Sequence, residues 1–172
     1  MTTSCLLLGS NLGDRLSYLR EAFKRLQQAG IQILAVSDVY ESNPWGFDSF
    51  DRFLNMAVTI ETNLAAVDLL ELCLLIEAEL GRIRAGEGYS SRTIDIDIVL
   101  YSSQVIDLDF LQIPHPRLSV RRFALVPVVQ LLPEVVHPVL KRSMIQLLNE
   151  CPDQNDVIFH TSGEHVWPGS SI

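Results

Sequence analysis

The sequence predicts an α+β fold: a ferredoxin-like antiparallel sheet in βαββαβ order, with helices on its faces in a three-layer α/β/α sandwich. Three observations support this prediction. Apolar runs with a period of two indicate strands, and apolar residues spaced by three and four indicate helices. These segments follow one another as strand, helix, strand, strand, helix, strand. Fold alone does not identify chemistry.

The length and composition are those of a globular protein. The 172 residues are 48% apolar and 20% charged, which suits a domain with a sizeable core. We expect one domain over residues 1–160 and a loose C-terminal tail over residues 161–172, which hold few apolar side chains. The N-terminus has no basic segment before its apolar run, so we expect neither a signal peptide nor a membrane span.

The first strand is expected at residues 4–8 and ends in a turn cluster at residues 9–13. An amphipathic helix follows, with Asp14 as its N-cap and Gly30 at its end. The turn cluster contains neither the dinucleotide-binding fingerprint nor a P-loop lysine, so a structural role is the first explanation.

Residues 31–40 predict a strand, and a break in its alternation suggests a bulge. The long loop at residues 41–52 carries three aromatic residues, which need cover from the core or from a flat ligand. Core cover is the more frequent explanation. In the strand at residues 53–60, Phe53 and Asn55 share one face, where the amide could hydrogen-bond to a heterocycle edge.

A second helix is expected at residues 65–80, ended by Gly81, and a loop at residues 82–92 leads into the next strand. Val105 and Ile106 follow that strand closely enough to form a hairpin with it.

Two prolines flank His115 and hold it in a rigid, extended turn, although a lone histidine is more often structural than functional. Residues 121–132 look helical despite Pro127, and the pattern of residues 141–149 predicts a last short helix.

The strand at residues 93–101 carries two acids on one face. Asp95 and Asp97 alternate with Ile94, Ile96 and Ile98, so their Cα atoms lie about 6.6 Å apart. Two carboxylates this close repel each other unless a positive group lies beside them. From the strand alone, a divalent-metal site and an ordinary solvated face are about equally good explanations.

The charge distribution favours a local anion site. The net charge of −8 argues against general nucleic-acid binding. Arginine is the side chain best suited to forked contacts with phosphate or carboxylate oxygens. Around the aspartates the basic residues are all arginines: Arg82, Arg84, Arg92, Arg117, Arg121 and Arg122.

The cysteines have no metal-like spacing. Cys5, Cys73 and Cys151 lie far apart, and the first two fall within apolar runs. Buried, reduced thiols are typical of a cytoplasmic protein, so we expect that location.

Several motifs in order resemble one family, the 6-hydroxymethyl-7,8-dihydropterin pyrophosphokinases of folate biosynthesis. The similarity covers about residues 4–140, and several motifs at consistent spacing are hard to match by accident. The motifs are Gly9-Ser10-Asn11-Leu12-Gly13, Pro44-Trp45-Gly46 with Phe53-Leu54-Asn55, Gly81-Arg82, Arg92-Thr93-Ile94-Asp95-Ile96-Asp97, and Pro114-His115-Pro116-Arg117 with Arg121 and Phe123.

This resemblance implies that the chain transfers pyrophosphate from ATP to the hydroxymethyl oxygen of the pterin and releases AMP. It also implies two Mg²⁺ ions held by Asp95 and Asp97. The implied partners are the two small-molecule substrates, with no nucleic acid and no membrane, and we expect a monomer. The chemistry agrees with the residues, because Mg²⁺ prefers carboxylate and phosphate oxygens.

Site roles follow from the resemblance, residue by residue. Arg82 and Arg92 correspond to catalytic arginines that act on the phosphates. The nucleotide contacts implied are Glu77, Arg84, Ile98, His115 and Arg121. The pterin contacts implied are Ser42, Trp45, Phe53, Asn55 and Phe123, with Phe53 and Phe123 stacking on the ring.

The sequence departs from the family in the loop before Arg92. Gly88-Tyr89-Ser90-Ser91 stands where the family commonly has Arg-Trp-Gly-Pro, so we expect Tyr89 to serve as an aromatic lid over the nucleotide. The altered loop leaves one alternative, a non-catalytic ferredoxin-like module that binds pterin or nucleotide, or has a regulatory role.

Overall fold

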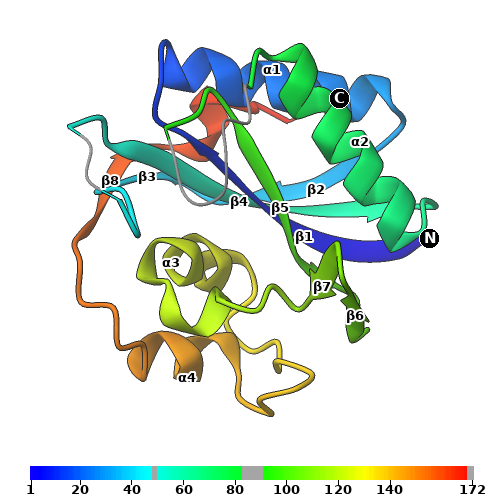
Figure 1. Ribbon diagram of the computed structural model, residues 1–172, viewed down its shortest axis with the longest axis vertical. Coiled ribbons are helices and arrows are strands. Elements are labelled where there is room, and N and C mark those ends of the chain that lie inside the picture. Colours follow the sequence, from blue (N-terminus) through cyan, green and yellow to red (C-terminus); the bar gives the residue numbers. More distant parts are fainter. Residues whose placement is uncertain (48–49, 83–90, 170–172) are drawn as a thin grey trace.

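An antiparallel sheet covered by helices on both faces forms the body of the protein. The computed structural model describes residues 1–47, 50–82 and 91–169. Helices α1 (Arg15–Gln28) and α2 (Ala66–Glu79) cover one face, whereas α3 (Arg122–Leu131) and α4 (Met144–Asn149) lie on the other (Figure 1). The prediction of an antiparallel sheet combined with helices is therefore confirmed.

The main sheet places the first strand of the chain near its centre. Among the described residues its strand order is β5-β1-β4-β3-β8, with β2 also paired to β4, and every pairing is antiparallel. A separate hairpin pairs β6 with β7. The bounds are β1 Thr2–Ser10, β2 Gln32–Val36, β3 Val39–Ser42, β4 Phe53–Thr62, β5 Asp95–Tyr101, β6 Ile106–Leu108, β7 Leu111–Ile113 and β8 Val157–Thr161.

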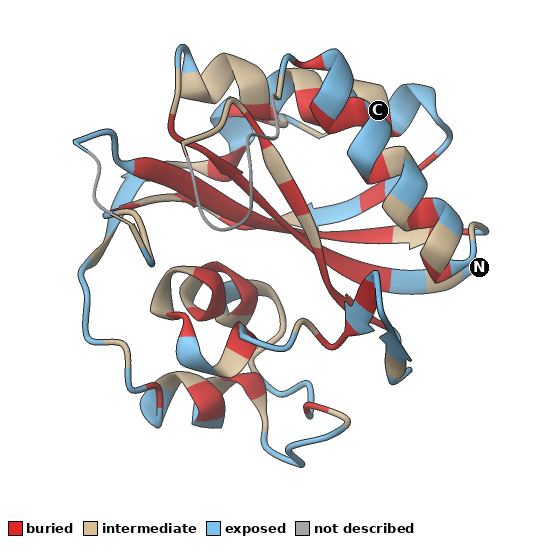
Figure 2. Ribbon diagram, viewed as in Figure 1, coloured by how far each residue is buried: buried red, intermediate tan, exposed pale blue. Residues whose placement is uncertain are grey.

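Alternation along β1 supplies side chains to two separate cores. Leu6 and Leu8 pack with α1 and α2, whereas Cys5 and Leu7 pack with α3 and α4. Figure 2 shows the resulting buried residues along the central strands and on the helix faces turned toward them. Because both faces of the sheet are covered, β1 is buried from Ser4 to Ser10, and its centre, Cys5 to Leu8, is a continuous apolar run rather than an alternation of apolar and polar residues.

The helix boundaries follow the predicted local signals. The side chain of Asp14 accepts a hydrogen bond from the backbone N–H of Ser17 at 3.1 Å and caps α1. Gly30 and Gly81 follow α1 and α2 with φ angles of +83° and +86°, a conformation that glycine adopts without steric cost. Short 3₁₀ helices are present at Leu118–Val120 and Gly163–His165.

The expected strand at residues 31–40 is two strands. β2 and β3 both pair with β4, and the predicted break in alternation, at Val36 to Val39, is the gap between these two strands. A register shift lies earlier, between Ile33 and Ala35. Ser37 separates the strands because its hydroxyl accepts a hydrogen bond from Ala57 N–H at 2.9 Å. A side-chain oxygen thus replaces one backbone partner in the sheet ladder.

The expected hairpin between residues 105–106 and the aspartate strand is wrong. After β5, Ser102 adopts a φ of +50° and donates its N–H to Thr3 O, so the chain turns away from the strand. Ile106 pairs instead with Ile113 in the β6–β7 hairpin. Because the connection between β6 and β7 is short, these two strands pair with each other.

The expectation of a loose tail is wrong for residues 161–169. Thr161 ends β8, and Val166 is only 5% exposed within the core beside α1. The backbone N–H of Gly163 donates to Asp38 Oδ1 at 3.2 Å, and a Cβ added there would lie 2.1 Å from Ser37 O. Close backbone packing, rather than apolar composition, fixes this segment.

Candidate active site

Three neighbouring strands bring the predicted site residues together on one face of the sheet. Gly9 on β1 lies opposite Asp95 on β5 and opposite Asn55 on β4. Leu7, two residues earlier on β1, lies opposite Asp97. Residues two apart in a strand share a face, so the register places the aspartates and Asn55 on either side of Gly9.

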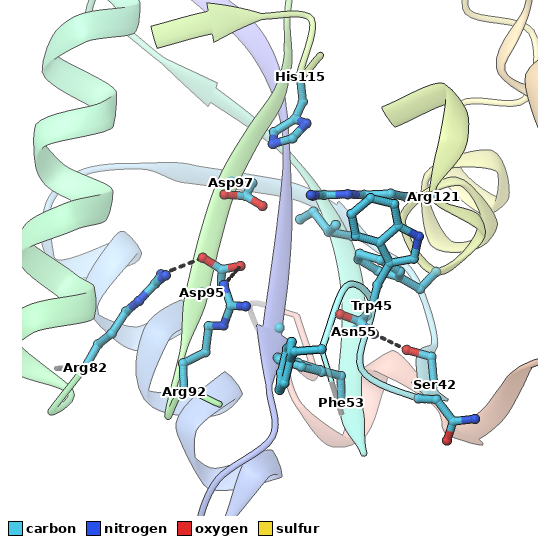
Figure 3. A pocket seen from close by; sticks show the side chains of 15 residues that line it. Ser42, Trp45, Phe53, Asn55, Arg82, Arg92, Asp95, Asp97, His115 and Arg121 are labelled. Carbon is cyan, nitrogen blue, oxygen red and sulfur yellow. Dashed lines mark hydrogen bonds and ion pairs between the residues drawn. The ribbon is translucent and has the colours of Figure 1, made fainter. Parts of the chain in front are cut away.

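This face borders a cavity of about 250 Å³, shown from close by in Figure 3. Sequence analysis predicted most of its lining. The predicted residues that line it are Ser42, Trp45, Phe53, Asn55, Arg82, Arg92, Asp95, Asp97, His115, Arg121 and Phe123. Arg84 and Tyr89, also predicted, lie outside the described residues.

Four lining residues were not predicted: Leu7, Gly9, Asn43 and Phe47. Gly9 belongs to a recognised turn cluster, but its place in the cavity depends on the pairing of β1 with both β4 and β5. Phe47 was visible as one of three aromatic residues in a loop, and its ring contacts Phe53 edge-on with centroids 6.2 Å apart. For Leu7 and Asn43 the sequence gives no signal that we recognise.

At one end of the cavity, two arginines hold Asp95. Arg82 Nη1 lies 2.5 Å from Asp95 Oδ1, and Arg92 Nη1 lies 3.1 Å from Asp95 Oδ2. Figure 3 shows both guanidinium groups turned toward this carboxylate. Both ion pairs are largely shielded from solvent, where charge-assisted hydrogen bonds are stronger than at the surface.

Glu77 was predicted to contact the nucleotide, but its side chain does not line the cavity. It is 2% exposed, and its Oε1 accepts hydrogen bonds from Arg82 Nη1 at 2.6 Å and from Ile96 N–H at 2.8 Å. Its observed role is to hold Arg82 against the end of β5. Ile98 likewise does not line the cavity, because it packs in the core beside α1 and α2 on the opposite face of the sheet.

Asp97 is in an environment that disfavours its negative charge. Burial raises the pKa of its carboxyl, and repulsion from Asp95 and Glu77 raises it further, while Arg121 and Arg92 oppose the shift. A cation placed between the two aspartates would remove this repulsion and favour the ionised form.

The two carboxylates suit a Mg²⁺ ion shared with a phosphate substrate. Within residues 1–47, 50–82 and 91–169, no group of three or more His, Cys, Asp or Glu side chains could hold a metal by itself. Mg²⁺ commonly takes one or two carboxylates and completes its octahedron with substrate phosphates and water. The donor set is therefore chemically suited to such an ion.

The other end of the cavity is aromatic. The guanidinium carbon of Arg121 lies 4.6 Å from the centre of the Trp45 ring and 5.8 Å from that of Phe123, and Arg92 lies 5.3 Å from that of Phe53. Such cation–π contacts are favourable when the groups are shielded from water. They make the aromatic and basic parts of the cavity one continuous surface.

A fixed amide group lies beside these rings. Asn55 Nδ2 donates to Ser42 Oγ at 2.9 Å, and both side chains are buried. Ser42 was expected in a loop but is the last residue of β3, where it fixes the orientation of the amide. Gly9 leaves the space above Asn55 open, since a Cβ there would lie 3.0 Å from Asn55 Oδ1.

His115 is neutral at ordinary pH and faces the cavity. Its Nδ1 accepts from the N–H of Arg117 at 3.2 Å, which assigns the ring proton to Nε2. Burial, assisted by the positive charge of Arg121, lowers its pKa from 6.5 to about 4. The Nε2–H group is therefore available to donate to an anionic ligand.

Comparisons with known proteins agree with this geometry. A family model described as 7,8-dihydro-6-hydroxymethylpterin-pyrophosphokinase matches residues 5–133. The 2-amino-4-hydroxy-6-hydroxymethyldihydropteridine pyrophosphokinase of Aquifex aeolicus is 39% identical over 144 residues, covering 84% of this chain and 89% of that protein. The Bacillus subtilis protein of the same name is 44% identical over 129 residues, covering 74% and 77%.

Solved structures share the fold. A crystal structure of an HPPK-DHPS in complex with substrates superposes with a TM-score of 0.69 at 13% identity. The match covers 87% of this chain but 43% of that longer chain, so the present chain spans less than half of it. At this identity the likeness concerns the fold alone. The sequence matches decide the family: this chain belongs to the 7,8-dihydro-6-hydroxymethylpterin-pyrophosphokinases.

Proposed function

We propose that this chain transfers the two terminal phosphates of ATP as one pyrophosphoryl group to 6-hydroxymethyl-7,8-dihydropterin, giving AMP and the pterin diphosphate in folate biosynthesis. One observation carries the proposal. A single cavity joins an acidic and arginine-rich end, which suits a metal triphosphate, to an aromatic end with a fixed amide, which suits a flat heterocycle. Membership of the pyrophosphokinase family supports the same reaction.

The triphosphate would bind at Asp95 and Asp97. These aspartates would hold Mg²⁺, two ions in our proposal, which neutralise phosphate charge when bound. Arg82 and Arg92 already lie against Asp95 and can exchange that carboxylate for phosphate oxygens. The Nε2–H of His115 and the guanidinium of Arg121 lie further along the same cavity and would donate to the nucleotide.

The pterin would bind at the aromatic end. Phe53 and Phe123 would stack on its ring, with Trp45 as a further wall, and Asn55 would hydrogen-bond to its edge. Ser42 holds the amide in one orientation, so little conformational entropy is lost when the ring binds.

The reaction requires alignment rather than a protein nucleophile. The pterin hydroxymethyl oxygen would attack the β-phosphorus and lose its proton to solvent. The bond between the β-phosphorus and the α,β-bridging oxygen would break, and AMP would depart with that oxygen. Positioning and charge stabilisation supply most of the rate enhancement in phosphoryl-type transfers. In the described part of the chain, no cysteine lines the cavity.

The strand order supports a finer description of the fold as ferredoxin-like. The order β5-β1-β4, followed by the paired segments β2 and β3, corresponds to the 4-1-3-2 arrangement of a βαββαβ core. We propose that residues 1–160, together with the packed residues 161–169, form one pyrophosphokinase domain and that a monomer is active, since one chain supplies both ends of the cavity. We also propose that Arg84 and Tyr89 contact the nucleotide; both residues lie outside the described ranges.

Cys5, Cys73 and Cys151 are buried free thiols, which supports a reducing compartment such as the cytoplasm. Among the described residues, no helix has the length and apolar character needed to cross a bilayer.

An omission experiment tests the reaction. The protein is incubated with ATP, Mg²⁺ and the pterin alcohol, and AMP is measured by chromatography with each component left out in turn. We expect AMP only when all three are present. Binding of both ligands without AMP would support the alternative, a non-catalytic pterin- and nucleotide-binding or regulatory module.

A further inference from the structure

Asn11, directly after β1, makes an unusual set of hydrogen bonds beside the site without lining the cavity. Its Oδ1 accepts from the backbone N–H of Arg92 at 2.7 Å, and its own N–H donates to Arg92 O at 3.1 Å. Its Nδ2 donates to Ser91 Oγ at 3.1 Å and to Asp51 O at 3.2 Å. The residue is 2% exposed, and truncation to alanine would remove its three side-chain hydrogen bonds while leaving the backbone bond to Arg92 O in place.

These contacts join two segments that are far apart in the sequence. Arg92 lies at the start of the segment that leads into the aspartate strand, and its guanidinium holds Asp95. Asp51 lies just before β4, whose first residues Phe53 and Asn55 form the aromatic end of the cavity. One carboxamide therefore links the backbones that lead to the two ends of the site.

The contacts to Arg92 have a specific geometric effect. Donating to its carbonyl and accepting from its N–H fixes both peptide groups of that residue, and with them the direction of its Cα–Cβ bond. The arginine side chain then extends past the Phe53 ring, 5.3 Å from its centre, to Asp95. A functional side chain is precise only when the backbone that carries it is held in this way.

We propose that Asn11 is a positioning residue for the triphosphate site: it fixes the backbone of Arg92 and ties it to the Asp51 segment, so that the arginine is preorganised for phosphate. Asn11 itself touches no substrate. This inference rests on the proposed function, because it takes the arginine and aspartate end of the cavity as the place where ATP binds. The alternative is a purely structural asparagine that stabilises the turn after β1.

The test compares nucleotide binding with pterin binding. In Asn11→Ala we expect the Kd for the α,β-methylene analogue of ATP with Mg²⁺ to rise about tenfold or more, because the side-chain hydrogen bonds that orient Arg92 are lost. The Kd for the pterin alone should stay within about threefold, because the hydrogen bond between Asn55 and Ser42 does not involve Asn11. In turnover, KM for ATP should rise while KM for the pterin changes little.

Ser4→Ala is the matched control. Ser4 is likewise buried, lies on β1 at the end far from the site, and donates its hydroxyl to Leu100 O at 2.7 Å. This variant should lose stability and keep wild-type Kd values. If Asn11→Ala lowers Tm without a change in either Kd, as expected for Ser4→Ala, the role of Asn11 is structural and the inference is overturned.

Asn11→Asp provides a second variant of nearly the same shape. It keeps a carboxylate oxygen that can accept from the Arg92 N–H but loses the donor to Asp51 O, so its nucleotide Kd should lie between those of wild type and Asn11→Ala. If nucleotide affinity falls as much in Asn11→Asp as in Asn11→Ala, the proposed positioning of Arg92 through its N–H is contradicted. If Asn11→Ala does not fold, Asn11→Asp is compared directly with wild type. A wild-type protein that binds the analogue but forms no AMP would overturn the proposed function alone, because the Asn11 comparison is made by binding.

Discussion

Gly9→Ala offers a minimal test of the pterin pocket, because it adds one methyl group between the two ends of the site. The backbone of Gly9 lies outside the left-handed region, so alanine can adopt it without strain. The new Cβ would lie 3.0 Å from Asn55 Oδ1 and 3.6 Å from Phe53 Cδ1. The first contact is tighter than normal van der Waals distance, so Asn55 must move by a few tenths of an ångström.

That movement acts directly on the group proposed to bind the pterin edge. Asn55 is tied to Ser42 at 2.9 Å, so displacing it weakens a buried hydrogen bond as well as narrowing the pocket. Loss of about 1 to 2 kcal/mol of ligand interaction corresponds to a rise of roughly 5- to 30-fold in the Kd for the pterin. The Kd for the ATP analogue should change far less, since Asp95 and Arg82 make no contact with the added methyl group.

The assay is a pterin fluorescence titration, with analogue binding measured on the same preparation. Gly30→Ala controls for lost stability: its φ of +83° strains an alanine, but an added Cβ there meets nothing within 4 Å. Pterin affinity unchanged in Gly9→Ala would refute the assignment of Asn55 and the pocket floor to the pterin.

Three further predictions follow from the charged groups. Asp97→Asn should abolish AMP formation and leave pterin affinity within about threefold of wild type in a fluorescence titration; full activity would refute the metal assignment. Arg82→Gln should tighten Mn²⁺ binding without nucleotide, measured by electron paramagnetic resonance, because a cation that competes for Asp95 is removed; weaker binding would contradict that competition. The pKa of His115 is lowered from 6.5 in the unfolded chain to about 4 in the fold, so its stabilising contribution is present above about pH 6.5 and is lost as the pH falls toward 4. Between about pH 7 and pH 4.5, the free energy of unfolding should therefore fall by about 2 kcal/mol less in His115→Gln than in wild type, as measured by urea titrations. Equal decreases in the two proteins would contradict the pKa shift.

The local features of this protein could be predicted from short stretches of sequence. Alternation around Asp95 and Asp97 gives their common face, and the N-cap at Asp14 and the stop at Gly30 are set by neighbouring residues. The motif resemblance then brought together residues from β3, β4, β5 and α3 that line one cavity. Such predictions succeed where a signal is carried by residues close in the chain.

Long-range pairing accounts for what was missed. Gly9 forms the cavity floor only because β1 lies between β4 and β5, and the pattern of β1 does not identify its neighbours. β8 contains typical strand residues, but it is short and largely exposed, and its sequence does not identify β3 as its partner. Glu77 was assigned to the nucleotide, but hydrogen bonds from Arg82 and from the N–H of Ile96, which lie 5 and 19 residues away in the chain, make burial of its charge possible.

Pyrophosphoryl transfer divides ATP between its α- and β-phosphates, and ³¹P NMR of the complete reaction measures this division directly. With ATP, Mg²⁺ and the pterin alcohol, the spectrum should gain the single resonance of AMP and the two coupled resonances of a diphosphate ester, at equal rates. Asp95→Asn should produce neither set. Appearance of ADP or inorganic phosphate in place of AMP, or of products at the wild-type rate in Asp95→Asn, would contradict pyrophosphoryl transfer at the two aspartates.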